Sequence, residues 1–156
     1  LRATDNATLA GLIRPLAQAK GYQVTDAYLE RVVALMKERV TFLPDFVEQG
    51  YYFFEQVREY DAETLQKKWN PALLPVLSEW CRYMKEFSPF EAPFLETGVK
   101  EFAVLHGVKA GDLLPLFRIA LAGTMKGPAV FDMAEAIGRS ETVGRLERFR
   151  EYLKIF

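Results

Sequence analysis

Apolar residues recur along most of this chain at intervals of three and four positions, with polar residues between them, which is the spacing of helices that bury one face. Hardly any stretch alternates apolar and polar residues with a period of two, so the pattern predicts no sheet. The helical segments predicted in this way are residues 9–20, 26–39, 45–54, 61–68, 71–84, 94–106, 113–121, 128–137 and 140–156. The expected fold class is therefore all-α, an irregular multi-helix bundle.

A proline-containing break, Ser-Pro-Phe-Glu-Ala-Pro at residues 88–93, interrupts this series of helices. Proline cannot continue a helix and favours a turn. We therefore expect two small helical lobes, residues 1–88 and residues 89–156, with this break as the hinge between them. Half of the residues are apolar, which is ample for a core in a fold of this size.

A loop with unusual polar content joins two of the predicted helices, and residues 117–131 are called the corner below. The helix that contains Arg118 ends at Gly123, and the next begins at Pro128, because glycine favours helix ends and proline favours first turns. Arg118 and Lys126 flank the free backbone N–H groups at the start of the second helix, which suits an anion or a nucleobase. The alternative is an ordinary interhelical turn with solvated charges.

Arg39 is a second candidate for binding, because it closes the predicted helix 26–39 shortly before a chain break at Pro44. A cation at this position offsets the dipole of the helix C-terminus, which is a sufficient role by itself. The aromatic run Tyr51 to Phe54 follows. Aromatic side chains this dense either stack on bases or pack in a core, and the acidic residues around them favour packing.

Charge permits a nucleic-acid partner without requiring one. The formal net charge is −1, whereas phosphate binding usually leaves a basic surface. Residues 1–41 carry six Lys and Arg against four Asp and Glu, residues 42–108 carry six against eleven, and residues 109–156 carry eight against six. The two ends are therefore mildly basic and the middle is acidic, which suits a protein that reads RNA bases more by shape and stacking than by bulk charge.

Enzymatic chemistry finds little support in the sequence. Cys81 is the one cysteine and His106 the one histidine, whereas metal sites and nucleophile-base pairs need more such groups. We expect Cys81 to be a buried structural thiol, and the sequence predicts no catalytic residue and no metal site. No glycine-rich phosphate loop, nucleophile elbow or zinc-protease motif is present.

The sequence also favours a cytoplasmic protein. No run approaches the ~18 apolar residues of a membrane span, and the start of the chain lacks the apolar core of a signal peptide. A single cysteine fits a reducing compartment. Because there is no initiator methionine, we expect the chain to be part of a longer protein.

The residues of the corner resemble a known family. Arg118-x-Ala-Leu-x-Gly123, then Gly127-Pro-x-Val-Phe131, then Ile137-Gly138 and Arg145-Leu146 resemble the C-terminus of bacterial-type glutamyl-tRNA synthetases. The stretch from Val108 to Phe117 resembles the approach to this corner. Residues 26–50 resemble an earlier helical segment of the same family, through Tyr28-Leu29 and the run from Met36 to Leu43. The resemblance covers most of the chain and is strongest over residues 107–148.

This resemblance implies an all-helical anticodon-binding domain and assigns roles to particular residues. Arg118 and the loop with Lys126, Gly127, Pro128 and Val130 would hold the first two anticodon bases, with Pro128 and Val130 packing on a base face. Arg39 would read the third base, because its forked donors match a base edge, and we expect it to emerge beside the corner. The sequence departs from relatives by having Ala122 in place of a frequent threonine, Gly127 in place of a hydroxyl residue and Val130 in place of leucine.

The family also suggests partners and cofactors. The expected partners are the anticodon stem-loop of tRNA(Glu) and the catalytic domain of the same protein, which is absent here, in a monomer. ATP and Mg²⁺ would serve that catalytic domain, and this fragment would bind neither and catalyse nothing. Some relatives read glutamine tRNAs, and the sequence does not separate the two. The alternative is a helical protein-interaction domain without RNA binding, in which the aromatic-rich middle forms a partner groove.

Overall fold

The computed structural model describes residues 2–156, which divide into two compact units, one within Leu1–Gln56 and the other Val57–Phe156. Each unit is described by itself. The boundary predicted after residue 88 falls inside the second unit. The helices on both sides of the 88–93 break pack against the same last helix, so this break connects two helices of one unit.

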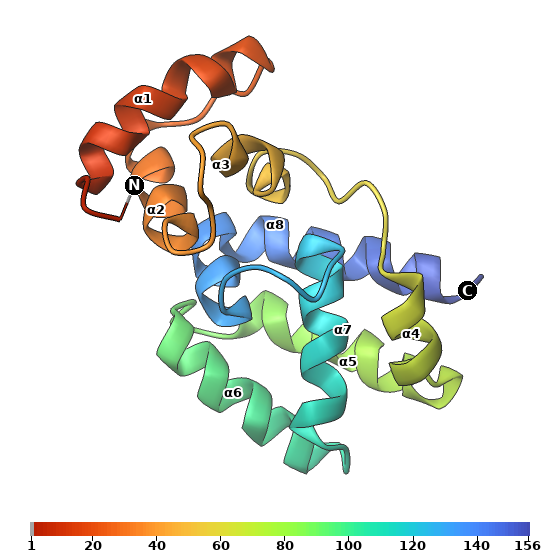
Figure 1. Ribbon diagram of the computed structural model, residues 1–156. Coiled ribbons are helices and arrows are strands. Elements are labelled where there is room, and N and C mark those ends of the chain that lie inside the picture. The colour runs from red at the N-terminus through yellow and green to blue at the C-terminus, as the bar shows by residue number, and fades with distance from the viewer. Residues whose placement is uncertain (1) are drawn as a thin grey trace. The chain divides into compact units, whose positions relative to one another are not determined.

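Helices make up both units, and residues 2–156 contain no strand, so the predicted all-α class is confirmed. The first unit contains α1 (Asn6–Ala19), α2 (Asp26–Met36), α3 (Asp45–Glu48) and a 3₁₀ turn, Tyr51–Phe53. The second contains α4 (Ala62–Lys68), a 3₁₀ turn at Pro71–Leu73, α5 (Leu74–Glu86), α6 (Ala92–Leu105), α7 (Ala110–Ala122) and α8 (Val130–Leu153) (Figure 1). Within the described residues, none of these helices is both long and apolar enough to cross a membrane.

In the first unit, α1 packs against α2, and each helix begins at a residue whose side chain caps it. The Asp5 carboxylate accepts a hydrogen bond of 2.8 Å from the Thr8 N–H, and the Thr25 hydroxyl accepts one of 3.1 Å from the Tyr28 N–H. These bonds satisfy backbone donors that the first helical turn leaves unpaired. The side chains buried in the core of this unit include Leu9, Ile13, Leu29, Val32, Val33, Met36, Phe46 and Val47.

The aromatic run Tyr51 to Phe54 takes part in packing within the first unit, which is the role that the sequence analysis favoured. Tyr52 and Phe53 are 2% and 4% exposed, and the Phe54 ring stacks on that of Tyr22 with their centres 5.1 Å apart. The Tyr28 hydroxyl donates to the Phe53 carbonyl at 2.5 Å, which ties this segment to α2. An aromatic groove for a protein partner, as the alternative hypothesis required, would need these rings at the surface.

In the second unit, α5, α6 and α7 all pack against α8, and Figure 1 shows α8 in blue beside α5. Trp80 on α5 is fully buried and lies 4.9 Å from the Phe117 ring on α7 and 6.1 Å from the Phe102 ring on α6. Aromatic side chains contribute the largest buried apolar area of any residue type. This cluster therefore forms the centre of the unit.

Two glycines interrupt the helices around the corner where the sequence predicts. Gly123 ends α7 in the left-handed conformation with φ +78°, and Gly138, with φ +86°, divides α8 into two helical segments. The second helix of the corner begins at Val130 and not at Pro128. The carbonyl of Pro128 accepts from Arg118, and the first helical bond of α8 goes from the Met133 N–H to the Ala129 carbonyl.

Gly123 is the glycine whose replacement we expect to be most damaging. An alanine Cβ there would overlap the Glu59 carbonyl oxygen and lie 2.6 Å from Val57 Cγ1. Overpacking costs about 1–3 kcal/mol, and the left-handed backbone adds about 1–2 kcal/mol for any side chain. We expect Gly123→Ala to lower the free energy of unfolding by about 2–5 kcal/mol.

Gly107→Ala is the matched control, because Gly107 also has a positive φ, +68°, but has no atom within 4 Å of an added Cβ. It should cost only about 1–2 kcal/mol. Urea unfolding followed by tryptophan fluorescence measures both variants, since Trp69 and Trp80 both lie in the second unit. Equal losses in the two variants would contradict the close approach at Gly123.

Candidate nucleic-acid interface

At the end of α7, the backbone of the corner is held by hydrogen bonds to α7 itself and to the segment before α4. The Gly123 N–H donates to the Ile119 carbonyl at 2.7 Å, and the Gly123 carbonyl accepts from the Asp61 N–H at 2.9 Å. Asp61 also caps α4, where its carboxylate accepts from both the hydroxyl and the N–H of Thr64. These hydrogen bonds, the one from the hydroxyl first, lower the pKa of Asp61. One residue therefore anchors both the corner and the start of α4.

Arg145 holds the end of α7 from the side of α8. Its side chain is buried, and its Nη1 donates to the Leu121 carbonyl at 2.5 Å while its Nε donates to Glu141 at 2.9 Å. The last carbonyls of a helix have no partner within that helix, and a cation there also offsets the helix dipole. Arg145 supplies both effects at the point where α7 stops.

Arg118 holds the other side of the corner. The residue is half-buried, and its Nη1 donates to the Pro128 carbonyl at 2.7 Å and reaches the Gly127 carbonyl at 3.5 Å. Arg118 therefore links the last turn of α7 to the segment that leads into α8.

The other predicted corner residues differ in how much of them reaches solvent. Lys126 is exposed and Gly127 is half-buried, but Pro128 and Val130 are buried, with Val130 6% exposed. The faces that Pro128 and Val130 were expected to offer to bases are thus covered in this conformation. Burial here depends on tertiary packing, which local sequence does not reveal.

Met125 is exposed at the tip of the corner and was missed by the sequence analysis. Its side chain is 40% exposed, next to the exposed Lys126. A large apolar residue between two glycines, outside any helical period, is the signal that could have identified it. The first turn of α8 also carries Asp132, whose charge disfavours phosphate at this helix end.

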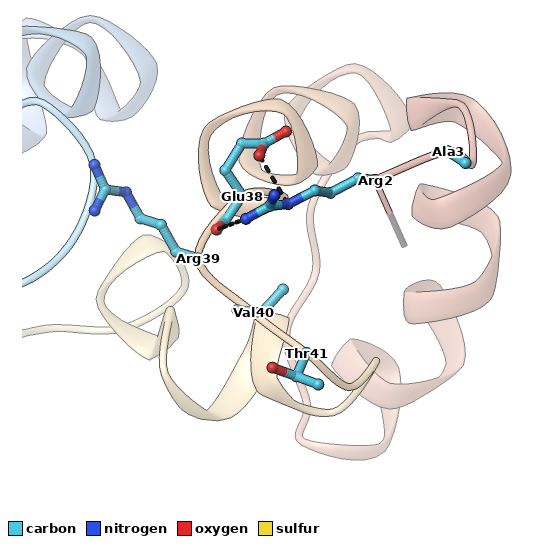
Figure 2. Close-up of a pocket in the computed structure, with 6 residues that line it drawn as sticks. All are labelled: Arg2, Ala3, Glu38, Arg39, Val40 and Thr41. Carbon is cyan, nitrogen blue, oxygen red and sulfur yellow. Dashed lines mark hydrogen bonds and ion pairs between the residues drawn. The ribbon is translucent and has the colours of Figure 1, made fainter.

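Arg39 lies in the first unit, in the turn after α2, where its N–H donates to the Met36 carbonyl at 2.8 Å. The side chain is exposed, and its guanidinium forms no hydrogen bond or ion pair with any residue in 2–156. It borders an open pocket of about 460 Å³, whose lining is Arg2, Ala3, Glu38, Arg39, Val40 and Thr41. In Figure 2, Arg39 points away from Glu38, which instead pairs with Arg2 at 2.9 Å.

Phe42 follows three positions after Arg39 and is the second residue that the sequence analysis missed. Its side chain is 68% exposed. Its backbone is fixed, because its N–H donates to the Asp45 carboxylate at 3.2 Å and its carbonyl accepts from the Asp45 N–H at 3.0 Å. An exposed aromatic ring on an anchored backbone is suited to stacking on an unpaired base.

The structure thus brings together Arg118, Lys126, Gly127, Pro128 and Val130 in the second unit. Arg39 belongs to the first unit, so its expected position beside the corner stays a prediction. Within residues 2–156, no group of three or more His, Cys, Asp and Glu could hold a metal ion. Cys81 is buried as expected, and desolvation raises the pKa of its thiol.

Comparison with known proteins identifies the class of this fold. Residues 8–150 match the family described as anticodon binding domain, so the chain belongs to that family. It is 37% identical over 153 residues to a glutamate-tRNA ligase of Porphyromonas gingivalis, covering 98% of this chain and 30% of that ligase. It is 35% identical over 150 residues to the glutamate-tRNA ligase of Parabacteroides distasonis, covering 96% and 30%.

A solved structure of a glutamate tRNA ligase from Elizabethkingia meningosepticum is similar with a TM-score of 0.89 and 27% identity, over 96% of this chain and 30% of that one. The resemblance inferred from the corner motifs is therefore confirmed. The chain spans about 30% of the length of the ligases that it matches.

The hydrogen bond from Arg145 to the Leu121 carbonyl leads to a stability prediction. Replacing Arg145 with methionine leaves the carbonyl of the fully buried Leu121 without this donor, and we expect the free energy of unfolding to fall by about 1–3 kcal/mol. Glu141→Gln should cost less than about 1 kcal/mol, because Glu141 is 44% exposed. Urea unfolding monitored by tryptophan fluorescence separates the two. If Glu141→Gln costs as much, the ion pair and not the carbonyl contact stabilises the corner.

Proposed function

We propose that this chain is the anticodon-reading domain of a glutamate-tRNA ligase, where it holds the anticodon loop of tRNA(Glu) so that glutamate is attached to the right tRNA. The observation that carries this proposal is the similarity to glutamate-tRNA ligases across 98% of the chain, within a family of anticodon-binding domains. On this proposal, ATP and Mg²⁺ serve the catalytic domain of the same protein. The ligase acts as a monomer in the cytoplasm.

Arg39 is the residue best placed to contact a base directly. A guanidinium presents five N–H donors in a fixed plane, which can pair with a base edge in two places. The Arg39 guanidinium is solvent-exposed and has no internal partner among the described residues, so base binding breaks no protein contact. Arg2, in contrast, is already paired with Glu38. The pocket beside Arg39 offers room for an unstacked nucleotide.

Apolar side chains supply the second kind of contact. Anticodon bases leave their stack when a protein reads them, and aromatic or apolar side chains then replace the neighbouring bases. Phe42 in the first unit and Met125 in the second are exposed and suited to this role. Such contacts do not require a basic surface, which agrees with the net charge of −1.

Binding of the isolated domain should be weaker than that of the whole ligase. The catalytic part would bind the acceptor end of the same tRNA, so each contact raises the effective concentration for the other. Experiments on specificity therefore use the full-length ligase.

Arg39→Gln in the full-length ligase tests the proposed function. We expect the preference for the third anticodon base to fall by about 1–3 kcal/mol, roughly 5- to 150-fold in kcat/KM, because a bidentate base contact is lost. The measurement is aminoacylation of tRNA(Glu) and of tRNA(Glu) with that base changed. Arg82→Gln is the control, since Arg82 is also exposed, at 73%, but lies on α5 in the second unit and does not line the pocket.

Two results would argue against this role of Arg39. An equal loss for every anticodon sequence, with a weaker salt dependence, would make Arg39 a phosphate contact. A wild-type ligase that charges all anticodon variants equally would contradict anticodon reading altogether.

Phe42→Ala tests the proposed stacking. Loss of one base-aromatic stack should weaken tRNA binding by about 1–3 kcal/mol, with little change in its salt dependence. Leu12→Ala is the matched control, because Leu12 is an exposed apolar residue of the same unit, at 51%, and lies on α1. Titration of the full-length ligase with tRNA(Glu) at two salt concentrations measures both. An identical effect of the two substitutions would exclude a stacking role for Phe42.

A further inference from the structure

The pocket beside Arg39 has a second arginine in its lining. Arg2 lines it together with Arg39, and Glu38 is the one acidic residue among the six described residues of the lining. Two guanidinium groups against one carboxylate give the lining a formal charge of +1, whereas the whole chain carries −1. The pocket is therefore a locally positive part of the first unit, and a concave site with this sign of charge attracts anions.

Arg2 belongs to the segment before α1, and contacts with the end of α2 hold this segment beside the pocket. The Lys37 ammonium donates to the Thr4 carbonyl and, at 3.3 Å, to Asn6 Oδ1. Arg2 Nη2 reaches the Glu38 carbonyl at 3.4 Å. The position of Arg2 at the pocket is thus fixed by two neighbouring parts of the same unit.

The ion pair between Arg2 and Glu38 is weak. Arg2 Nε lies 2.9 Å from the Glu38 carboxylate, but the two side chains are 72% and 67% exposed. Water screens such a pair, and two long side chains must be ordered to form it, so it contributes little to stability. Figure 2 shows the Arg39 guanidinium pointing away from this pair. Arg2 can therefore exchange Glu38 for another anion at small cost.

The backbone of the pocket adds neutral donors. Val40 and Thr41 also belong to the lining. Within residues 2–156, neither their backbone N–H groups nor the Thr41 hydroxyl takes part in a hydrogen bond. Free N–H groups in a turn are suited to anions, and an anion that accepts from them breaks no internal hydrogen bond.

We propose that Arg2 binds a phosphate of the anticodon loop, next to the nucleotide whose base Arg39 reads, and that Arg2 leaves Glu38 to do so. This inference rests on the proposed function, which it deepens by dividing the pocket into a phosphate contact and a base contact. Guanidinium and phosphate form strong, often bidentate hydrogen bonds. A phosphate contact fixes the register of the RNA and carries no sequence information, so Arg2 places the base that Arg39 distinguishes.

The test measures binding of tRNA(Glu) to the full-length ligase at several salt concentrations, with the variants Arg2→Gln and Glu38→Gln. Arg82→Gln and Glu79→Gln are the matched controls, because Arg82 and Glu79 form an exposed ion pair of the same kind, at 2.7 Å, on α5 and do not line the pocket. A second set of measurements uses tRNA(Glu) in which an uncharged methylphosphonate replaces one of the two phosphates that flank the third anticodon nucleotide.

A phosphate contact predicts a particular combination of results. Arg2→Gln should weaken binding about two- to fivefold for every anticodon sequence and lower the slope of log K against log salt by about 0.7. Glu38→Gln should strengthen binding by a similar factor, because Arg2 then gives up no charged partner. One of the two methylphosphonates should weaken binding to the wild type but not to Arg2→Gln. Both control variants should bind like the wild type.

Other results would overturn the proposal. A loss at one anticodon base with an unchanged salt slope would make Arg2 a base contact. Weaker binding by Glu38→Gln would contradict the exchange of partners, and methylphosphonate effects that are equal in the wild type and Arg2→Gln would exclude a contact of Arg2 with either phosphate.

Failure of the proposed function can be told apart from failure of this inference. A wild-type ligase that charges all anticodon variants equally contradicts anticodon reading. The salt slopes and the methylphosphonate substitutions still test the phosphate contact in that case, because they do not depend on the identity of any base.

Discussion

The end of α7 is the constraint on which the second unit depends. A helix leaves its last carbonyls unpaired, and α7 ends inside the unit, where water does not satisfy them. Arg145 donates to the Leu121 carbonyl, Gly123 turns the chain in a left-handed conformation, and the Asp61 N–H donates to Gly123. These contacts join α7, α8 and the start of α4 at one point. The direction in which the corner leaves α7 follows from them.

The sequence predicts the parts of the fold that local chemistry determines. Asp5, Thr25, Asp61 and Asn70 cap helical segments with short polar side chains of the kind that favours this position, and Gly123 and Gly138 interrupt helices as expected. The role of residues 88–93, in contrast, is not determined by local chemistry. Prolines look the same in a linker between lobes and in a turn within one, and the packing of α5 and α6 on α8 comes from residues far away in sequence.

The same distinction holds for the candidate site. Arg39 is exposed at a helix end, which could be inferred from its position after an apolar face. The burial of Pro128 and Val130 could not, because both are apolar residues beside a glycine and only their tertiary neighbours decide which way they face. The partners of Arg118 are likewise backbone atoms of a loop that forms only when α7 and α8 are packed.

Arg118 binds main-chain oxygen atoms of Gly127 and Pro128, and not the side chains at the tip of the loop. Side chains at positions 125 and 126 can therefore be exchanged without removing the bond that holds the loop. The corner is in this respect a frame with replaceable contact groups, similar in principle to a binding loop on an antibody scaffold. On the proposed function, a library varied at these two positions could be selected for altered anticodon preference while the helices beneath stay as they are.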